Sequence, residues 1–239
     1  RTVVARVAER GDIPLFLSGA AASCDERTGL SRLRKGEYEG LEARLKGTDT
    51  VHDDDTRLPD AGAMAWTETV ARSGGITVGA RPILVAYNVN VDEKDARVAR
   101  KIGSIVRTSG RMLKSEQGGK IRSHGMLKAV QGMGVPVEEL GISQVSMNLL
   151  NVTDCPLHLA FKTCESLAND HETSLCGSEI VGLVPLQAMI SAGEFFAPEA
   201  EDERAKVAAA IKGLGLNHHH RFVPDEHIIE WALDREVIQ

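Results

Sequence analysis

The chain has 239 residues, 42% hydrophobic and 26% charged, which is enough for a buried core in one large domain or two small ones. Its formal net charge of -6 argues against a nucleic-acid-binding protein but leaves room for a local basic site that binds a small anion. No apolar run of about 18 residues occurs, so no membrane span is expected, and the first residues, RTVVARVAERGD, do not form a signal peptide.

In chain order, the N-terminal pattern predicts short elements separated by long loops. These are a helix over residues 1–10, a buried strand over 13–17, a loop over 18–30 and a helix over 31–45. Residues 47–75 hold an acidic run followed by glycine and proline, which indicates a long irregular stretch. Because the chain lacks an initiator methionine and begins within a helical pattern, we expect it to start inside a longer protein.

A regular alternation of strands and helices follows. The predicted elements are a strand over 83–91, a helix over 93–108, a basic loop over 110–125, strands over 127–135 and 142–150, a helix over 156–169 and a strand over 175–183. This order predicts an α+β fold of the ferredoxin-like type. Two or three helices should follow, over 185–196, 201–212 and 224–234.

Polar residues occur within the predicted strands. In GARPILVAYN, residues 79–88, and just beyond it, Asn88 and Asn90 share one side of the strand. These amides suit a ligand site, although a solvated sheet face explains the same pattern.

A second polar set lies on the two middle strands. Gln144, Ser146 and Asn148 share one face, and Gln131 falls on the neighbouring strand. Uncharged hydrogen-bonding groups are typical of a pocket that binds a heterocycle. The alternative interpretation of the same pattern is a polar, solvent-facing sheet surface. Gly182 inside GSEIVGLVPL suggests that another group approaches the backbone closely there. The alternative is an ordinary transition from a strand to the next helix.

Six segments in this order resemble the formiminotransferase family: IPLFLSGAAA, GEYEGL, VQGMG, QVSMNLL, VGLVPL and PDEHIIEWAL. The resemblance implies transfer of the formimino group from N-formimidoyl-L-glutamate to tetrahydrofolate, which yields 5-formimidoyltetrahydrofolate and glutamate in histidine degradation. It also implies α/β two-layer subdomains whose sheets face a ligand tunnel, with residues 1–92 as the remainder of the first and 93–239 as a complete second one. Family members commonly form homodimers, and some work with a cyclodeaminase; we expect a cytoplasmic protein.

The resemblance also implies two sets of site residues. The family's folate-binding stretch matches Gly79, Ala80, Arg81, Pro82, Ile83, Leu84, Val85, Ala86, Tyr87 and Asn88. The substrate pocket would include Lys128, Gln131, Gln144, Ser146 and Asn148. Arg81 and Lys128 would bind the carboxylates of the folate tail and of the substrate.

No catalytic residue is assigned in this chain. A histidine suits both proton transfers of the reaction, and the family's histidine lies in a segment upstream of Arg1. None of the eight histidines matches its motif, so we expect weak or no turnover from this chain alone; His124 is the single substitute worth testing.

Metal binding is not expected from the sequence. The four cysteines are scattered without a CxxC pair, which indicates thiols in a reducing cytosol. The run of histidines at 218–220 is expected to be an exposed turn, because adjacent residues rarely converge on one ion.

Departures from the family pattern keep alternatives open. The chain has Ser18-Gly19-Ala20 where the family commonly has an aromatic residue and a glutamate, and Pro82 where it has a basic residue. One alternative is a non-catalytic folate-binding or interaction module. Another is transfer of a formyl group from N-formyl-glutamate, which would use a similar acceptor pocket.

Overall fold

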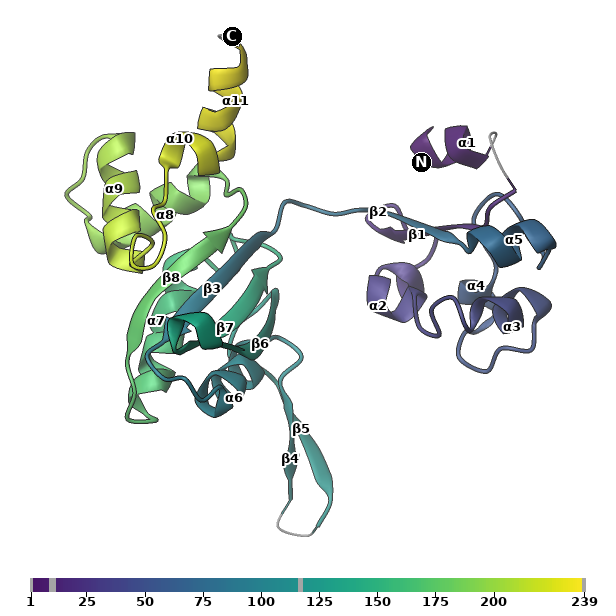
Figure 1. Cartoon of the computed structure of the whole chain (residues 1–239), viewed down its shortest axis with the longest axis horizontal. Helices are drawn as coiled ribbons and strands as arrows, with labels where there is room; N and C mark the ends of the chain where they lie inside the picture. The colour runs from purple at the N-terminus through teal and green to yellow at the C-terminus, as the bar shows by residue number, and fades with distance from the viewer. Residues whose placement is uncertain (1, 9–11, 116–117, 238–239) are drawn as a thin grey trace. The chain divides into compact units, whose positions relative to one another are not determined.

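A computed structural model of the chain describes residues 2–8, 12–115 and 118–237 (Figure 1). The chain divides into two compact units between Arg81 and Pro82. This division precedes the expected boundary near Asp92, because the strand that ends at Val91 belongs to the sheet of the second unit. The predictions for residues 1, 9–10 and 116–117 lie outside the described residues.

The first unit combines short helices with a two-stranded parallel sheet. Its elements are α1 (Thr2–Ala8), β1 (Leu15–Gly19), the 3-10 helix η1 (Asp25–Arg27), α2 (Leu30–Leu33), α3 (Leu41–Lys46), α4 (Asp54–Arg57), α5 (Glu68–Ser73) and β2 (Ile76–Ala80). Strand β1 is apolar on both faces: Leu15 and Leu17 pack with Val4 of α1, and Phe16 packs with Leu33 and residues of α3 and α5. It therefore forms the centre of this unit.

Charged groups buried in the first unit have partners. Asp60 accepts a hydrogen bond from the Leu17 amide at 2.7 Å and from Arg27 Nη1 at 2.5 Å. Arg44 donates to backbone carbonyls of α2 and α4, and its guanidinium lies 4.0 Å over the Phe16 ring. Burial lowers the pKa of Arg44 to about 10, so it stays charged at neutral pH.

The first unit is more regular than its sequence suggests. The predicted helix 31–45 is divided into α2 and α3, because Gly36 and Glu37 take positive φ values of 90° and 47° between them. The predicted irregular stretch 47–75 contains α4 and α5, each capped by a side chain: Asp53 accepts from Thr56 N, and Thr67 accepts from Val70 N. Strand β2 was not predicted, since most of its residues are exposed and show no buried face.

The second unit is built around a four-stranded sheet. Its elements are β3 (Val85–Val91), α6 (Arg97–Val106), β4 (Arg111–Lys114), β5 (Lys120–Ser123), β6 (Val130–Val137), the 3-10 helix η2 (Glu138–Leu140), β7 (Ile142–Leu149), α7 (Leu157–Asn169), β8 (Leu175–Val181), α8 (Leu186–Phe196), α9 (Glu203–Leu214), α10 (Pro224–His227) and α11 (Ile229–Val237). The strands lie in the order β6-β7-β3-β8, and neighbours are antiparallel (Figure 1). Mixed helix and strand in both units confirms the predicted α+β class.

Helices α6 and α7 pack on one face of this sheet, where the core lies. Val85, Tyr87 and Val89 of β3 point into that core, and so do Val145 and Met147 of β7. Because side chains alternate along a strand, the polar residues between them lie on the opposite face.

Glycines explain how closely α6 approaches β6. A Cβ atom added at Gly134 would lie 2.0 Å from the backbone nitrogen of Arg100, and one at Gly103 would lie 2.7 Å from the backbone carbon of Met133. The glycines of the VQGMG segment therefore serve helix packing, while Gln131 and Met133 point to the other face.

Element limits in the second unit differ from prediction at a few places. The basic loop predicted over 110–125 contains the β4–β5 hairpin, because its charged residues gave no apolar alternation to read. The strand predicted from residue 83 begins at Val85, so residues 81–84 connect β2 to β3 without strand structure. The helices predicted over 93–108 and 201–212 correspond to α6 and α9.

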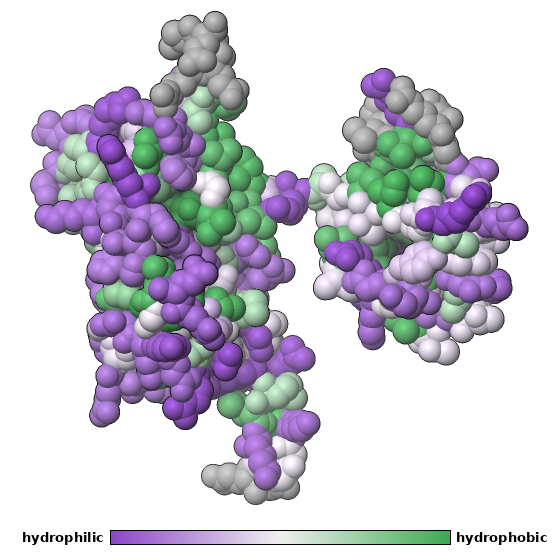
Figure 2. Space-filling view, viewed as in Figure 1, coloured by the Kyte–Doolittle hydropathy of each residue, from purple (hydrophilic) through white to green (hydrophobic). Residues whose placement is uncertain are grey.

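Among the described residues, no helix combines the length and apolarity that crossing a membrane requires. Hydrophobic patches are nevertheless visible on the surface of each unit (Figure 2). The exposed large hydrophobic residues include Met64 in the first unit and Met133, Val181 and Leu183 in the second.

Candidate functional site: the polar sheet face of the second unit

The face of the second sheet that points away from α6 and α7 carries connected polar side chains. We call it the polar sheet face. It comprises Asn88, Asn90, Gln131, Gln144, Ser146, Asn148 and Glu179.

Glu179 of β8 is the centre of this network. Its Oε1 atom accepts a hydrogen bond from Asn88 Nδ2 and another from Gln144 Nε2, both at 2.9 Å. Gln144 Nε2 also lies 2.9 Å from Asn90 Oδ1. Amides from two strands thus hold one carboxylate oxygen in place, and within the described part of the chain no hydrogen bond occupies the other oxygen.

Asn90 lies at the edge of this network and has an unused donor. Its side chain is only 1% exposed, and within the described residues its Nδ2 atom has no hydrogen-bond partner. The pairing of β3 with β8 shifts register between Val89 and Val91, which leaves Asn90 opposite an irregularity rather than a paired residue. A buried donor without a partner is costly, so this position favours a ligand or water.

The structure divides the predicted folate segment between two strands. Gly79 and Ala80 end β2 in the first unit, and Val85 opens β3 in the second. Val85 and Tyr87 are fully buried in the core, so their side chains do not reach the polar sheet face. Ala86 and Asn88 do lie on that face. Arg81, Pro82, Ile83 and Leu84 form the connection between the units, where Arg81 is exposed.

Tyr87 instead has a structural partner. Its hydroxyl donates to Ser178 Oγ at 3.0 Å, and Ser178 Oγ donates to the Leu214 carbonyl at 2.6 Å. Burial raises the pKa of Tyr87, which keeps the phenol neutral. Tyr87 therefore ties β3 to β8 and α9.

The predicted pocket residues are partly brought together. Gln144, Ser146 and Asn148 share the face as the strand period requires, and Asn148 Nδ2 donates to Gln131 Oε1 at 3.3 Å. Lys128 is exposed in the segment before β6.

Glu179 was missed by the sequence analysis. The alternation in GSEIV could have found it, because Ser178 and Ile180 are buried and leave the acidic residue between them on the outer face.

The first unit contributes a separate feature around the GEYEGL segment. A surface pocket of about 370 Å³ is lined by Arg34, Tyr38 and Gly40 together with residues of β1 and β2. Tyr38 closes one side, since its hydroxyl donates to the Ala71 carbonyl at 2.5 Å. The segment thus shapes a concave surface in its own unit.

His52 is a histidine of the first unit with an unusual environment. Its Nδ1 atom lies 2.5 Å from Asp49 Oδ2, and its Nε2 atom is buried without a hydrogen-bond partner among the described residues. Burial opposes the charge of Asp49, but the Val51 amide and the His52 ring together lower the pKa of Asp49 below its usual range. His124 is exposed in the segment after β5.

The fold and the network define an α+β protein with a partly exposed polar sheet face suited to a polar small molecule. Comparison with known families identifies the group. Residues 86–234 match the formiminotransferase domain, and residues 1–81 match the N-terminal subdomain of the formiminotransferase domain. The chain belongs to the formiminotransferase family.

Similar proteins carry two related names. The formimidoyltransferase-cyclodeaminases of Dictyostelium discoideum and Gallus gallus are 34% and 35% identical, over 97% and 95% of this chain. The glutamate formimidoyltransferase of Streptococcus pyogenes serotype M1 is 34% identical over 82% of this chain and 58% of its own length. The chain spans 40% and 39% of the length of the two cyclodeaminase relatives.

Proposed function

We propose that this chain is part of a glutamate formimidoyltransferase, which moves the formimino group from N-formimidoyl-L-glutamate to tetrahydrofolate. Family membership over both units supports the reaction class. The single structural observation that carries the proposal is the Glu179 carboxylate, oriented by Asn88 and Gln144 on a partly exposed sheet face.

The chemistry of the formimino group of the substrate fits this carboxylate. A formimino group attached to nitrogen is an amidine, and its protonated form presents N–H donors that a carboxylate accepts in short, charge-assisted hydrogen bonds. In our proposal the second oxygen of Glu179 binds this group, while the neighbouring amides fix the orientation of the carboxylate. Nitrogen N5 of tetrahydrofolate then attacks the formimino carbon and loses its proton; the glutamate nitrogen gains a proton, and its bond to the formimino carbon breaks.

Carboxylates of both substrates need cationic partners. Arg81 and Lys128 are exposed and positively charged, and we propose them for the folate tail and the substrate. Alanine at either position should raise the dissociation constant of folinate, measured by calorimetry with the 239-residue chain. Unchanged folinate binding in both variants would show that neither Arg81 nor Lys128 belongs to the site.

The test of Glu179 is its isosteric amide. E179Q should weaken binding of formimidoyl-glutamate about 10-fold or more, because it loses one charge-assisted pair while keeping the shape of the side chain. E139Q is the matched control, since Glu139 is an exposed carboxylate in η2, away from the network. Equal affinity of E179Q and the unaltered chain would disprove this role.

Further parts of the proposal follow from the family. We propose that the second unit is ferredoxin-like, supported by the order β3-α6-β6-β7-α7-β8 with the β4–β5 hairpin inserted. We also propose a cytoplasmic homodimer associated with a cyclodeaminase activity. Sedimentation of the purified protein tests the dimer, and a monomer at all concentrations would contradict it.

A further inference from the structure

Three side chains of types that can ligate a metal cluster at the edge of the second sheet. Cys176 belongs to β8, and His218 and His219 follow the end of α9. One ligand atom from each lies within 4.8 Å of the others, and Cys176 Sγ is 3.8 Å from His219 Nε2. Adjacent residues do converge here, because one ring nitrogen of His218 and one of His219 lie within 4.8 Å of each other; the two rings are nearly perpendicular, at 81°.

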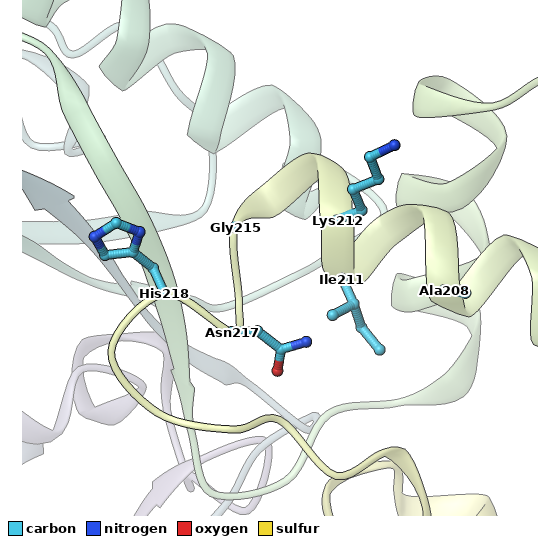
Figure 3. Close-up of a pocket in the computed structure, with 6 residues that line it drawn as sticks. All are labelled: Ala208, Ile211, Lys212, Gly215, Asn217 and His218. Atoms are coloured by element: carbon cyan, nitrogen blue, oxygen red, sulfur yellow. The ribbon is translucent and has the colours of Figure 1, made fainter.

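The backbone brings this cluster together by direct packing. Gly177 has φ of 108°, and a Cβ atom there would lie 2.6 Å from His218 Cβ and 2.8 Å from the Gly215 carbonyl oxygen. Only glycine therefore lets the segment after α9 lie against β8 beside Cys176. Figure 3 shows His218 on that segment, next to the strand.

Hydrogen bonds hold the two segments in this position. The Ser178 amide donates to the Gly215 carbonyl at 3.2 Å, and the Ser178 hydroxyl donates to the Leu214 carbonyl at 2.6 Å. The ligand atoms thus come from a strand and a segment fixed to it. Such support is what a preorganised metal site requires.

The separations suit a tetrahedral ion. Zn–S bonds of about 2.3 Å and Zn–N bonds of about 2.0–2.1 Å place sulfur and nitrogen about 3.6 Å apart. The measured 3.8 Å between Cys176 Sγ and His219 Nε2 is close to this value. The ligand atoms all lie within 4.8 Å of one another, so each separation exceeds the expected value by at most about 1.2 Å, a difference that side-chain rotation can close.

Access from solvent is also favourable. His218 is exposed and lines a surface pocket of about 490 Å³ with Asn217 and with Lys212 and other residues of α9 (Figure 3), so an ion can reach the cluster from solvent.

We infer that Cys176, His218 and His219 bind one Zn²⁺ ion, with a fourth position open to water or another oxygen ligand. The site is distinct from the proposed formimino-binding carboxylate, and it binds metal whether or not folate binds. Zn²⁺ would link β8 to the end of α9, and so stabilise the edge of the polar sheet face.

The test uses the full 239-residue protein without an affinity tag, freed of metal by chelation. Co²⁺ serves as the spectroscopic probe and Zn²⁺ as its competitor. We expect one Co²⁺ per chain, a thiolate-to-cobalt charge-transfer band in the near ultraviolet, and loss of both signals when Zn²⁺ is added.

The variants assign the ligands. C176S should abolish the charge-transfer band, and H218Q and H219Q should each weaken Zn²⁺ binding by at least about 10-fold. H220Q is the matched control, because His220 is the adjacent exposed histidine outside the cluster, and it should bind like the unaltered protein. Far-ultraviolet circular dichroism checks that each variant is folded.

Two results would overturn the inference. One is the absence of a thiolate band in the unaltered protein at one equivalent of Co²⁺. The other is an H220Q variant that loses as much affinity as H219Q, which would show non-specific binding to a histidine run.

Discussion

The close packing of α6 on β6 can be tested by adding a single methyl group at Gly134. In G134A the new Cβ atom would lie 2.0 Å from Arg100 N, about 1.4 Å closer than ordinary van der Waals contact allows. Because the opposing atoms are helix backbone, no flexible side chain can move aside, and α6 must shift as a body. Overpacking of this kind costs about 1–3 kcal/mol and occasionally more, and here we expect about 3 kcal/mol.

The assay is urea unfolding followed by tryptophan fluorescence. The chain has two tryptophans, Trp66 in the first unit and Trp231 in the second, so a variant that retains only Trp231 reports on the second unit. A loss of 3 kcal/mol corresponds to a fall in melting temperature on the order of 6–12 °C for a unit of this size. G119A is the control, because nothing lies within 4 Å of a Cβ atom added at Gly119. If G134A unfolds within about 0.5 kcal/mol of the control, the packing explanation of the VQGMG glycines is wrong.

Three further predictions concern stability. S178A should destabilise the second unit by about 1–3 kcal/mol, since it leaves the buried Tyr87 hydroxyl without its acceptor, whereas Y87F should cost about 1 kcal/mol. Equal, small losses of unfolding free energy in both variants would contradict the chain of hydrogen bonds. T67A should lower the stability of the first unit by about 1 kcal/mol, because the Thr67 hydroxyl caps α5, and T67S should restore it; a T67S variant as unstable as T67A would rule out the cap. The pKa of Asp49 is lowered in the folded state, so its contribution is present above the unfolded pKa of about 4 and is lost as pH falls through the folded value. D49N should therefore have a lower melting temperature than the unaltered protein at pH 7 and the same melting temperature at strongly acidic pH. A difference in melting temperature that persists in acid would refute the idea that the ionised Asp49 is stabilised by His52 and the Val51 amide.

The order of elements in the second unit could be read from the sequence because its strands and helices have strong periodic patterns. Alternation along residues 83–91 and 142–150 placed Asn88, Gln144, Ser146 and Asn148 on one face, and the register of β3 with β7 confirms that they share it. The short helices and β2 of the first unit could not be read in this way. They are held by caps, by buried ion pairs such as Arg27–Asp60 and by contacts with distant residues.

By itself, the sequence determined the α+β class, the polar alternation of the central strands and the membership of a family, since each depends on residue order alone. Only the tertiary structure decided that Glu179 joins Asn88 and Gln144, although 91 and 35 residues separate them from it along the chain. It also decided that the VQGMG glycines serve α6, and that Cys176 meets His219 from 43 residues away. The physical reason is that strand pairing and close packing bring distant residues together through backbone register, and no local pattern carries that information.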